Sequence, residues 1–165
     1  MSHIHNPGTD FVAEVYIVRS STVLLRMHDK YHKWLPPGGH IEQVGLREDP
    51  NQAALREVLE EVGIDDLVLW NPLPAEWICA PEVMAEVLPL VPPVHLNIHN
   101  VGSEGHAHVA LVFFGSSRQG EVRESADARE RSGGLKWCTK EDLEEMDIPP
   151  STLRYALHAL SILGS

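Results

Sequence analysis

Cysteine is scarce in this chain, with only Cys79 and Cys138 among 165 residues. Two cysteines cannot build a disulfide framework, and their spacing matches no zinc-binding motif. Long apolar runs are also missing: the most apolar stretch, residues 83–94, is broken by Glu86 and three prolines and is shorter than the roughly 20 residues that span a bilayer. The first ten residues contain no basic segment followed by an apolar one, so we expect a soluble, cytoplasmic protein with no membrane segment.

Positive charge is scarce as well, since 13 Lys and Arg stand against 24 Asp and Glu, a net charge of −11. Such a chain releases no counterions from a polyanion, which argues against nucleic acids and anionic membranes as partners. A small anionic substrate remains compatible with this charge if a cation mediates its binding. An apolar share of 43% suffices for a hydrophobic core, and the length predicts a single domain over residues 1–165.

Strands and helices are predicted in a non-alternating order, which favours an α+β fold over a doubly wound one. Short segments rich in apolar and β-branched residues predict the strands. These are Phe11–Val18, Thr22–Met27, Val68–Trp70, Val94–Asn100, His106–Gly115 and Leu135–Trp137. The predicted helices are Pro50–Val62, Lys140–Met146 and Ser151–Leu163.

Two proline-containing segments are predicted to be loops. The first is Pro36–Gly39, and the second is the long connection Asn71–Pro93, with a short helix at Glu82–Leu88. Connections of that length are usually functional or disordered. We interpret the second as a flap that shapes a substrate site or as a contact in a possible homodimer.

The helix Pro50–Val62 has clear end signals. Asp49 suits the N-cap, Gln52 completes a capping box, and Gly63 suits the C-terminal stop. A helical wheel puts Glu57, Glu60 and Glu61 opposite the apolar residues. The predicted core face consists of Leu55, Val58, Leu59 and Val62.

Three carboxylates at positions i, i+3 and i+4 repel one another, and the helix macrodipole disfavours anions near a C-terminus. A bound divalent cation would compensate both effects. The alternative is a solvated acidic helix face.

Residues 56–64 read Arg-Glu-Val-Leu-Glu-Glu-Val-Gly-Ile, a string that resembles the Nudix box of the Nudix hydrolases. Upstream, residues 38–42 (Gly-Gly-His-Ile-Glu) are similar to the glycine loop of that box, and Glu48 precedes Arg56 by seven intervening residues, as in the family. One departure is the spacing from Gly39 to Glu48, which encloses eight residues, three more than is usual in the family. We interpret the extra residues as a longer loop before the helix.

The resemblance implies an α/β/α sandwich with a mixed central sheet. It also implies Mg²⁺-dependent or Mn²⁺-dependent hydrolysis of a pyrophosphate bond in a nucleoside diphosphate-linked substrate, a small anionic partner. The metal ligands would be Glu57, Glu60, Glu61 and the carbonyl of Gly39, with Arg56 orienting the carboxylates. Two alternatives stay open: a catalytically silent nucleotide-binding domain with a regulatory role, and an isomerase acting on prenyl diphosphates.

The general base has several candidates. Family resemblance favours Glu60, whereas some relatives use a glutamate from a loop across the site. Glu124, Asp127 and Glu130 lie in the loop before the Leu135–Trp137 strand, where such a residue often sits. Each of the three is also explained as a plain surface charge.

Substrate contacts are predicted in two places. Lys33 and Trp34 precede the glycine loop and could meet phosphates and a base, although a solvated hairpin tip is the alternative. The second place is a pair of predicted strands whose histidines share a face: His95, His99, His106 and His108. These imidazoles could form a nucleotide pocket with His95 and His108 as contacts, hold a transition metal, or be half-exposed strand positions.

Overall fold

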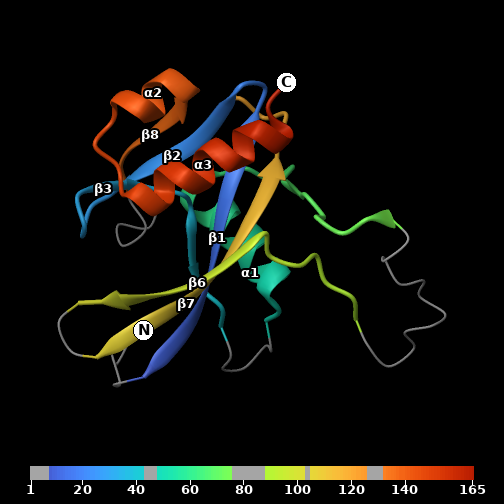
Figure 1. Ribbon diagram of the computed structural model, residues 1–165, viewed down its shortest axis with the longest axis vertical. Coiled ribbons are helices and arrows are strands. Elements are labelled where there is room, and N and C mark those ends of the chain that lie inside the picture. The colour runs from blue at the N-terminus through green and yellow to red at the C-terminus, as the bar shows by residue number, and fades with distance from the viewer. Residues whose placement is uncertain (1–7, 43–47, 76–87, 103–104, 126–131) are drawn as a thin grey trace.

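The computed structural model describes residues 8–42, 48–75, 88–102, 105–125 and 132–165. These residues form one eight-stranded sheet and three helices (Figure 1). The strands are β1 (Thr9–Arg19), β2 (Thr22–His28), β3 (Lys33–Leu35), β4 (Gly38–His40), β5 (Val68–Leu69), β6 (His95–Val101), β7 (His106–Ser116) and β8 (Ser132–Cys138). The helices are α1 (Pro50–Val62), α2 (Lys140–Glu145) and α3 (Pro150–Leu163). None of the helices in the described ranges is long and apolar enough to span a membrane.

β1 organises the sheet because it pairs with three other strands. β7 runs parallel to β1 over residues 9–18, β2 pairs antiparallel with its end at Val18 and Arg19, and β4 pairs antiparallel from Val12 to Glu14. β5 and β6 continue the sheet beyond β7, while β3 and β8 continue it beyond β2. The combination of a parallel pair with antiparallel pairs confirms the predicted mixed sheet.

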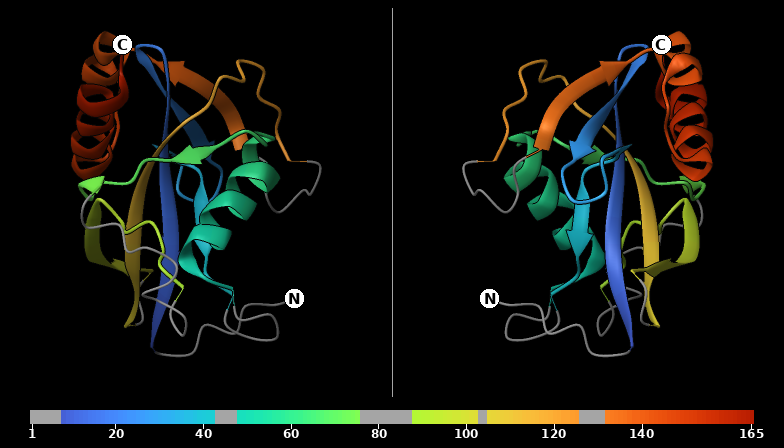
Figure 2. Two further views of the ribbon diagram at one scale, coloured as in Figure 1. Left: turned by 90° about the vertical axis from the view of Figure 1, so that its right-hand side faces the viewer. Right: turned by 90° about the vertical axis from the view of Figure 1, so that its left-hand side faces the viewer.

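Helices cover both faces of this sheet, as the two side views show (Figure 2). On one face, Ala53 and Val58 of α1 pack in a core cluster with Val15 and Ile17 of β1. On the opposite face, α2 and α3 pack against a second cluster that includes Tyr16. The α+β sandwich expected from the sequence is therefore confirmed.

α1 begins and ends at the residues that its end signals predict. The Asp49 carboxylate accepts a hydrogen bond from the Gln52 backbone N–H at 2.9 Å, and the Gln52 side chain accepts one from the Asp49 N–H at 3.1 Å. Gly63 ends the helix with a left-handed φ of 72°, and its N–H donates to the Leu59 carbonyl. These bonds satisfy terminal backbone groups locally, which is why the sequence alone reveals this helix.

The predicted core face of α1 is half wrong. Val58 and Val62 are buried, but Leu55 and Leu59 are 44% and 47% exposed. The buried face is rotated toward small residues and two glutamates: Ala53, Ala54, Glu57, Val58, Glu61 and Val62. Alanines let the helix approach the sheet closely, and the glutamates tolerate burial because arginines pair with them, a tertiary effect that a hydrophobic wheel does not include.

The loop predicted over Pro36–Gly39 is wrong in its second half, because Gly38–His40 form β4. β4 pairs with β1 closely: a Cβ on Gly38, whose φ is 155°, would lie 2.2 Å from the Ala13 carbonyl oxygen. Only glycine permits this approach. Lys33–Leu35 likewise form β3. Strands of three residues are defined by their partners, so hydrophobic patterning does not detect them.

Three further predictions concern the last strand and the long connection after β5. The β8 strand is longer than the predicted Leu135–Trp137, because it pairs with β2 along most of its length. The helix predicted at Glu82–Leu88 falls, apart from Leu88, outside the described residues. The flap or dimer contact predicted for Asn71–Pro93 falls largely outside them as well and stays a prediction.

Replacing Asp49 with Ala should lower the free energy of unfolding by about 1 kcal/mol, because an N–H group at the start of α1 loses its acceptor. Urea denaturation measures the difference. The matched control is D65A, an exposed aspartate beyond the helix end, which should change stability by less than about 0.5 kcal/mol. Equal effects of the two substitutions would contradict the capping role.

Candidate active site

Glu57 and Glu61 lie on the buried side of α1 with exposed fractions of only 7% and 3%. The Glu57 carboxylate lies directly against the backbone of Gly39: a Cβ at Gly39 would lie 2.5 Å from Glu57 Cδ. The absence of a side chain at Gly39 is what lets the carboxylate reach β4. Three of the four predicted metal-ligating residues, Glu57, Glu61 and Gly39, thus meet at the junction of α1 and β4.

Arg26 of β2 forms an ion pair with the Glu61 carboxylate. Both side chains are buried, with exposed fractions of 6% and 4%. The backbone N–H of Gly38 donates a hydrogen bond of 2.9 Å to the other carboxylate oxygen, Oε2. A buried carboxylate without such partners would be strongly destabilising, so Arg26 and Gly38 offset the cost of burying Glu61 beside β4.

Arg56 connects the remaining carboxylates of the site. It pairs with both carboxylate oxygens of Glu48 at 2.7 and 3.0 Å, with Glu57 at 2.7 Å and with Glu60 at 3.1 Å. Its Nη2 also donates to the His40 carbonyl at 3.0 Å. The Arg56 hydrogen bonds lower the pKa of Glu48, and the Glu48 carboxylate raises the pKa of Arg56. The longer loop before Glu48 therefore leaves its bond to Arg56 intact.

Glu60 differs from the other two glutamates of the helix because its side chain is 50% exposed. Its neighbours Glu57 and Glu61 are buried on the sheet side of α1. Arg56 Nη1 holds the Glu60 carboxylate while leaving it accessible to water. The helical wheel predicts one uniform acidic face for the three glutamates. In the structure, two of the carboxylates are buried and the third is open to solvent.

The donor set at this junction fits a hard divalent cation. Glu57, Glu60 and Glu61 offer carboxylate oxygens and Gly39 offers a carbonyl, the ligand type that Mg²⁺ and Mn²⁺ prefer. The close approach of Gly39 to Glu57 would be lost with any larger residue. The residues present therefore fit the ion that the family resemblance implies.

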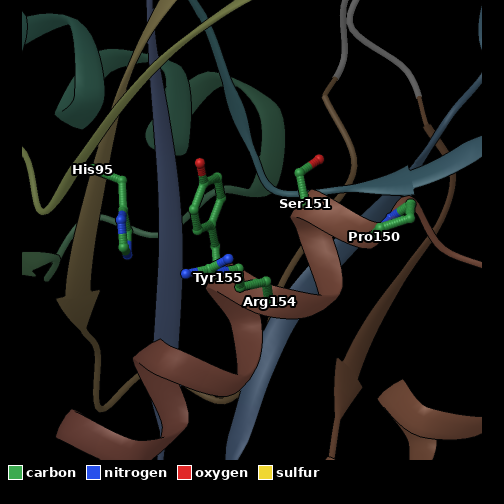
Figure 3. Close-up of a pocket in the computed structure, with 5 residues that line it drawn as sticks. All are labelled: His95, Pro150, Ser151, Arg154 and Tyr155. Atoms are coloured by element: carbon green, nitrogen blue, oxygen red, sulfur yellow. The ribbon is translucent and has the colours of Figure 1, made fainter.

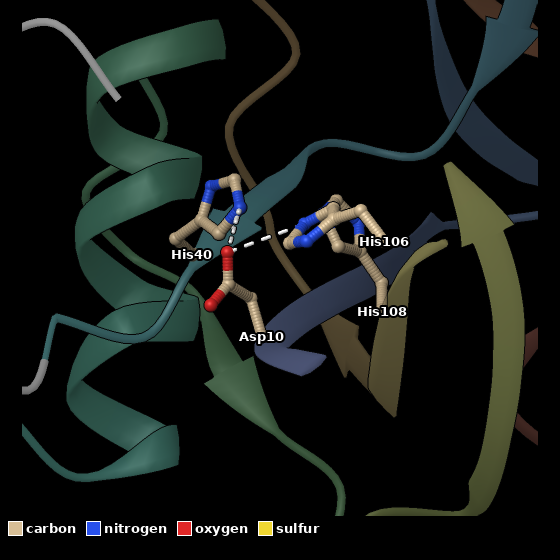
Figure 4. A group of neighbouring side chains, drawn as sticks. All are labelled: Asp10, His40, His106 and His108. Carbon is tan, nitrogen blue, oxygen red and sulfur yellow. Dashed lines mark ion pairs between the residues drawn. The ribbon is translucent and has the colours of Figure 1, made fainter. Parts of the chain in front are cut away.

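A second group of side chains gathers where β1, β4 and β7 meet (Figure 4). Asp10, His40, His106 and His108 each offer a ligand atom, and these atoms all lie within 4.8 Å of one another. Asp10 Oδ2 lies 3.3 Å from His106 Nε2 and 3.6 Å from His40 Nε2. Burial, helped by the neighbouring imidazoles, lowers the pKa of His108 to about 4, so His108 is neutral near pH 7.

The predicted convergence of strand histidines is thus partly correct. His99 lies directly opposite His108 in the β6–β7 register, with ring centroids 5.6 Å apart. His95 instead lies beside α3, where it stacks on Tyr155 and hydrogen-bonds to His158 at 2.8 Å. It lines a pocket of about 410 Å³ with Pro150, Ser151, Arg154 and Tyr155 (Figure 3).

Of the other predicted site residues, Lys33, Trp34 and Glu124 are among those that the structure describes. Lys33 is exposed on β3. Trp34 is half-buried and packs against the core cluster on the α3 side of the sheet, so packing already accounts for part of its surface. Glu124 is exposed. Asp127 and Glu130 lie outside the described residues, so the second candidate for a general base stays a prediction.

Sequence reasoning missed Arg26, Asp10 and Glu14. Arg26 and Glu14 are charged residues inside otherwise apolar strands, and that interruption is the signal that could have identified them. Glu14 lies in register with Gly38 on one side and Val112 on the other, and burial raises its pKa to about 7. A carboxyl with such a pKa can exchange a proton at neutral pH.

Replacing Arg26 with Met should lower the free energy of unfolding by about 3–5 kcal/mol, because Glu61 would lose its buried cationic partner. The double variant R26M/E61M removes both charges and should recover most of that loss. Urea denaturation of the two variants measures the difference. An R26M protein as stable as the wild type would contradict the role of this ion pair.

Glu14 should make stability fall as the pH rises. Between pH 4.5 and 7 the unfolded chain releases the Glu14 proton while the folded protein retains it, so the free energy of unfolding decreases by up to about 3 kcal/mol. E14Q lacks this titration and should gain on the wild type between about pH 5 and about pH 8 in urea denaturation. If the free energies of unfolding of E14Q and the wild type differ by the same amount at both pH values, Glu14 has an ordinary pKa.

Comparison with known proteins identifies the family. The sequence model of the NUDIX domain matches residues 9–157. A NUDIX-family hydrolase from Clostridium perfringens shares 34% sequence identity with this chain, and the match covers 96% of this chain and 99% of that one with a TM-score of 0.80. A search among curated proteins found no match.

More distant solved structures share the fold. They include a MutT NUDIX hydrolase from Burkholderia pseudomallei, with 22% identity, 92% of this chain and 98% of that chain covered, and a TM-score of 0.61. An Ap4A hydrolase from C. elegans shares 20% sequence identity with this chain, and the match covers 93% of this chain and 96% of that one with a TM-score of 0.62. From the family match and the 34% identical hydrolase, we conclude that this chain belongs to the Nudix family and is a hydrolase of the pyrophosphatase class.

Proposed function

We propose that this protein hydrolyses the pyrophosphate bond of a nucleoside diphosphate linked to another group, with Mg²⁺ or Mn²⁺ held at the α1–β4 junction. The observation that carries the proposal is the pair of buried glutamates, Glu57 and Glu61, set against a glycine backbone and paired with arginines. The arginines hold these carboxylates in place, and carboxylate oxygens beside a glycine carbonyl are the ligands that a hard divalent cation takes. A diphosphate substrate needs such a cation at an acidic protein.

Glu57, Glu60, Glu61 and the Gly39 carbonyl would hold the ion. When bound, such an ion neutralises the diphosphate and lowers the pKa of a coordinated water. Arg56 keeps Glu57 and Glu60 in place through its hydrogen bonds, and Glu48 in turn fixes Arg56. Arg56 is therefore a positioning residue, whose contacts are with carboxylates and with the His40 carbonyl.

Glu60 is our proposed general base, because its carboxylate is half-exposed and therefore open to water. The Glu60 carboxylate would take a proton from a water molecule while the oxygen of that water forms a bond to phosphorus. The bridging P–O bond then breaks, and the leaving phosphate keeps that bond's electron pair. Glu130 is the rival for this role, and a variant at each position distinguishes them.

The nucleoside end of the substrate would occupy the α3 side of the sheet. A row of paired residues, Gly38, Glu14, Val112 and His95, runs from the α1–β4 junction to the pocket beneath Tyr155. Three strand spacings of about 4.8 Å therefore separate β4 from this pocket by about 14 Å. His95 and Tyr155 stack on each other and line this pocket, so a base would contact the stacked pair at its outer face.

Three further contacts complete the proposed substrate site. Arg154 offers a cation to a phosphate or ribose at the edge of the same pocket. Lys33 and Trp34 would contact the distal group from β3. His108 would contact substrate only if it is not engaged by an ion of its own.

A substrate panel tests the reaction class and names the substrate. Nucleoside triphosphates, ADP-sugars, dinucleotides and dinucleoside polyphosphates are incubated with Mg²⁺ or Mn²⁺ and the products are separated by chromatography. We expect phosphate or nucleoside monophosphate products from one of these groups, and none after chelation of the metal. Nucleotide binding without turnover on any substrate would contradict the proposal and favour a silent binding domain.

E60Q should lower kcat by about 10²- to 10⁴-fold with little effect on the free energy of unfolding, since the residue is exposed and serves in proton transfer. The matched control is E144Q, an exposed helix glutamate of α2, which should keep wild-type kcat. A full kcat in E60Q together with a large loss in E130Q would assign the base to Glu130.

A further inference from the structure

We infer that Asp10, His40, His106 and His108 form a binding site for a transition-metal ion such as Zn²⁺, separate from the carboxylate site on α1. The four ligand atoms lie within 4.8 Å of one another. They come from three strands whose backbones are paired, so the site is built on the rigid part of the sheet. This inference does not depend on the proposed substrate or on the identity of the general base.

Two of the distances within the cluster are close to those between the ligand atoms of a tetrahedral site. Zn²⁺ binds imidazole nitrogen at about 2.0–2.1 Å and carboxylate oxygen at about 2.0–2.2 Å, so neighbouring ligand atoms of a tetrahedron lie about 3.3–3.5 Å apart. Asp10 Oδ2 lies 3.3 Å from His106 Nε2 and 3.6 Å from His40 Nε2. Three imidazoles and one carboxylate also match the nitrogen-rich donor sets that transition metals take.

The Asp10 carboxylate forms ion pairs with both His40 and His106, and the His108 ring packs beside them (Figure 4). The His108 ring is nearly perpendicular to those of His40 and His106, with centroid distances of 4.9 and 5.2 Å. Its Nε2 atom is inaccessible to solvent and has no hydrogen-bond partner among the described residues. A buried imidazole nitrogen in that condition costs free energy, which coordination of an ion would recover.

β4 separates this cluster from the carboxylate site. His40 is in register with Val12, whose side chain packs in the α3-side core, while Gly39 is in register with Ala13, which packs on the α1 side. The imidazoles and the Asp10 carboxylate therefore lie on one side of β4, and the carboxylates of α1 lie on the other. This division lets the chain bind a soft-to-borderline ion and a hard ion in adjacent but chemically distinct places.

The site has a structural consequence for the reaction centre. An ion bound by His40 would tie β4 to β1 and β7 through side chains as well as through backbone hydrogen bonds. Because Gly39 directly follows Gly38 and precedes His40, the same ion would fix the glycine backbone against Glu57. We expect an ion at this site to raise the melting temperature of the protein.

The test uses untagged, full-length protein freed of metal by chelation and dialysis. Titration calorimetry with Zn²⁺ should give one tight equivalent that millimolar Mg²⁺ does not displace. Co²⁺ should give the intense visible absorption of a tetrahedral complex, which Zn²⁺ abolishes. Failure of the wild type to bind Zn²⁺, or a weak octahedral Co²⁺ spectrum, would overturn the inference.

Variants locate the ion. H108Q and H40Q should each weaken Zn²⁺ binding at least about 100-fold. Loss of a residue that only supports a metal ligand costs about 10- to 100-fold in affinity, and loss of the ligand itself should cost at least as much. H40Q is less disruptive to folding, since the His40 side chain is 36% exposed in the wild type. Far-UV circular dichroism without metal checks the folding of both variants. Unchanged Zn²⁺ affinity in folded H40Q and H108Q would overturn the inference.

Two controls exclude other histidines and the glutamates. The double variant H3Q/H5Q removes the imidazoles near the N-terminus, and H158Q removes one beside α3; both should keep wild-type Zn²⁺ affinity. E60Q should also keep it, because that exposed carboxylate belongs to the site on α1 and its loss leaves the fold intact. Loss of Zn²⁺ binding in any of these three proteins would assign the ion elsewhere and contradict the site.

Discussion

The contact between the Glu57 carboxylate and the backbone of Gly39 is the constraint on which the rest of the site depends. It requires a glycine, since a Cβ there would lie 2.5 Å from Glu57 Cδ, and it requires a helix that buries a charged residue against a sheet. Burial of charge then requires partners, which explains why Arg56 contacts four groups and why Arg26 occupies an apolar strand.

β4 makes this arrangement possible although it is only three residues long. It is held by pairing with β1, and its two glycines give both α1 and β1 close access to its backbone. The next residue, His40, then faces the opposite side of the sheet among other imidazoles. One short strand thus borders an oxygen-rich site and a nitrogen-rich site, and each site is expected to reinforce the position of the strand.

Features encoded by neighbours in the sequence could be predicted, whereas features that arise from distant contacts could not. The range of α1 followed from Asp49, Gln52 and Gly63, and the box glutamates followed from their spacing to Arg56. The burial of Glu61 could not be predicted, because its partner Arg26 lies on another strand. β4 was missed for the same reason. The histidine cluster was only half predicted, since Asp10 and His40 reach it through strand pairing that no local pattern encodes.

The proposed reaction requires a hard divalent ion at the α1–β4 junction, between carboxylates and the Gly39 carbonyl. The most direct measurement is anomalous X-ray diffraction from crystals of this protein equilibrated with Mn²⁺. We expect an anomalous peak within coordination distance of Glu57, Glu61 and the Gly39 carbonyl oxygen. A well-ordered junction with no peak there, at Mn²⁺ concentrations that support hydrolysis, would contradict it.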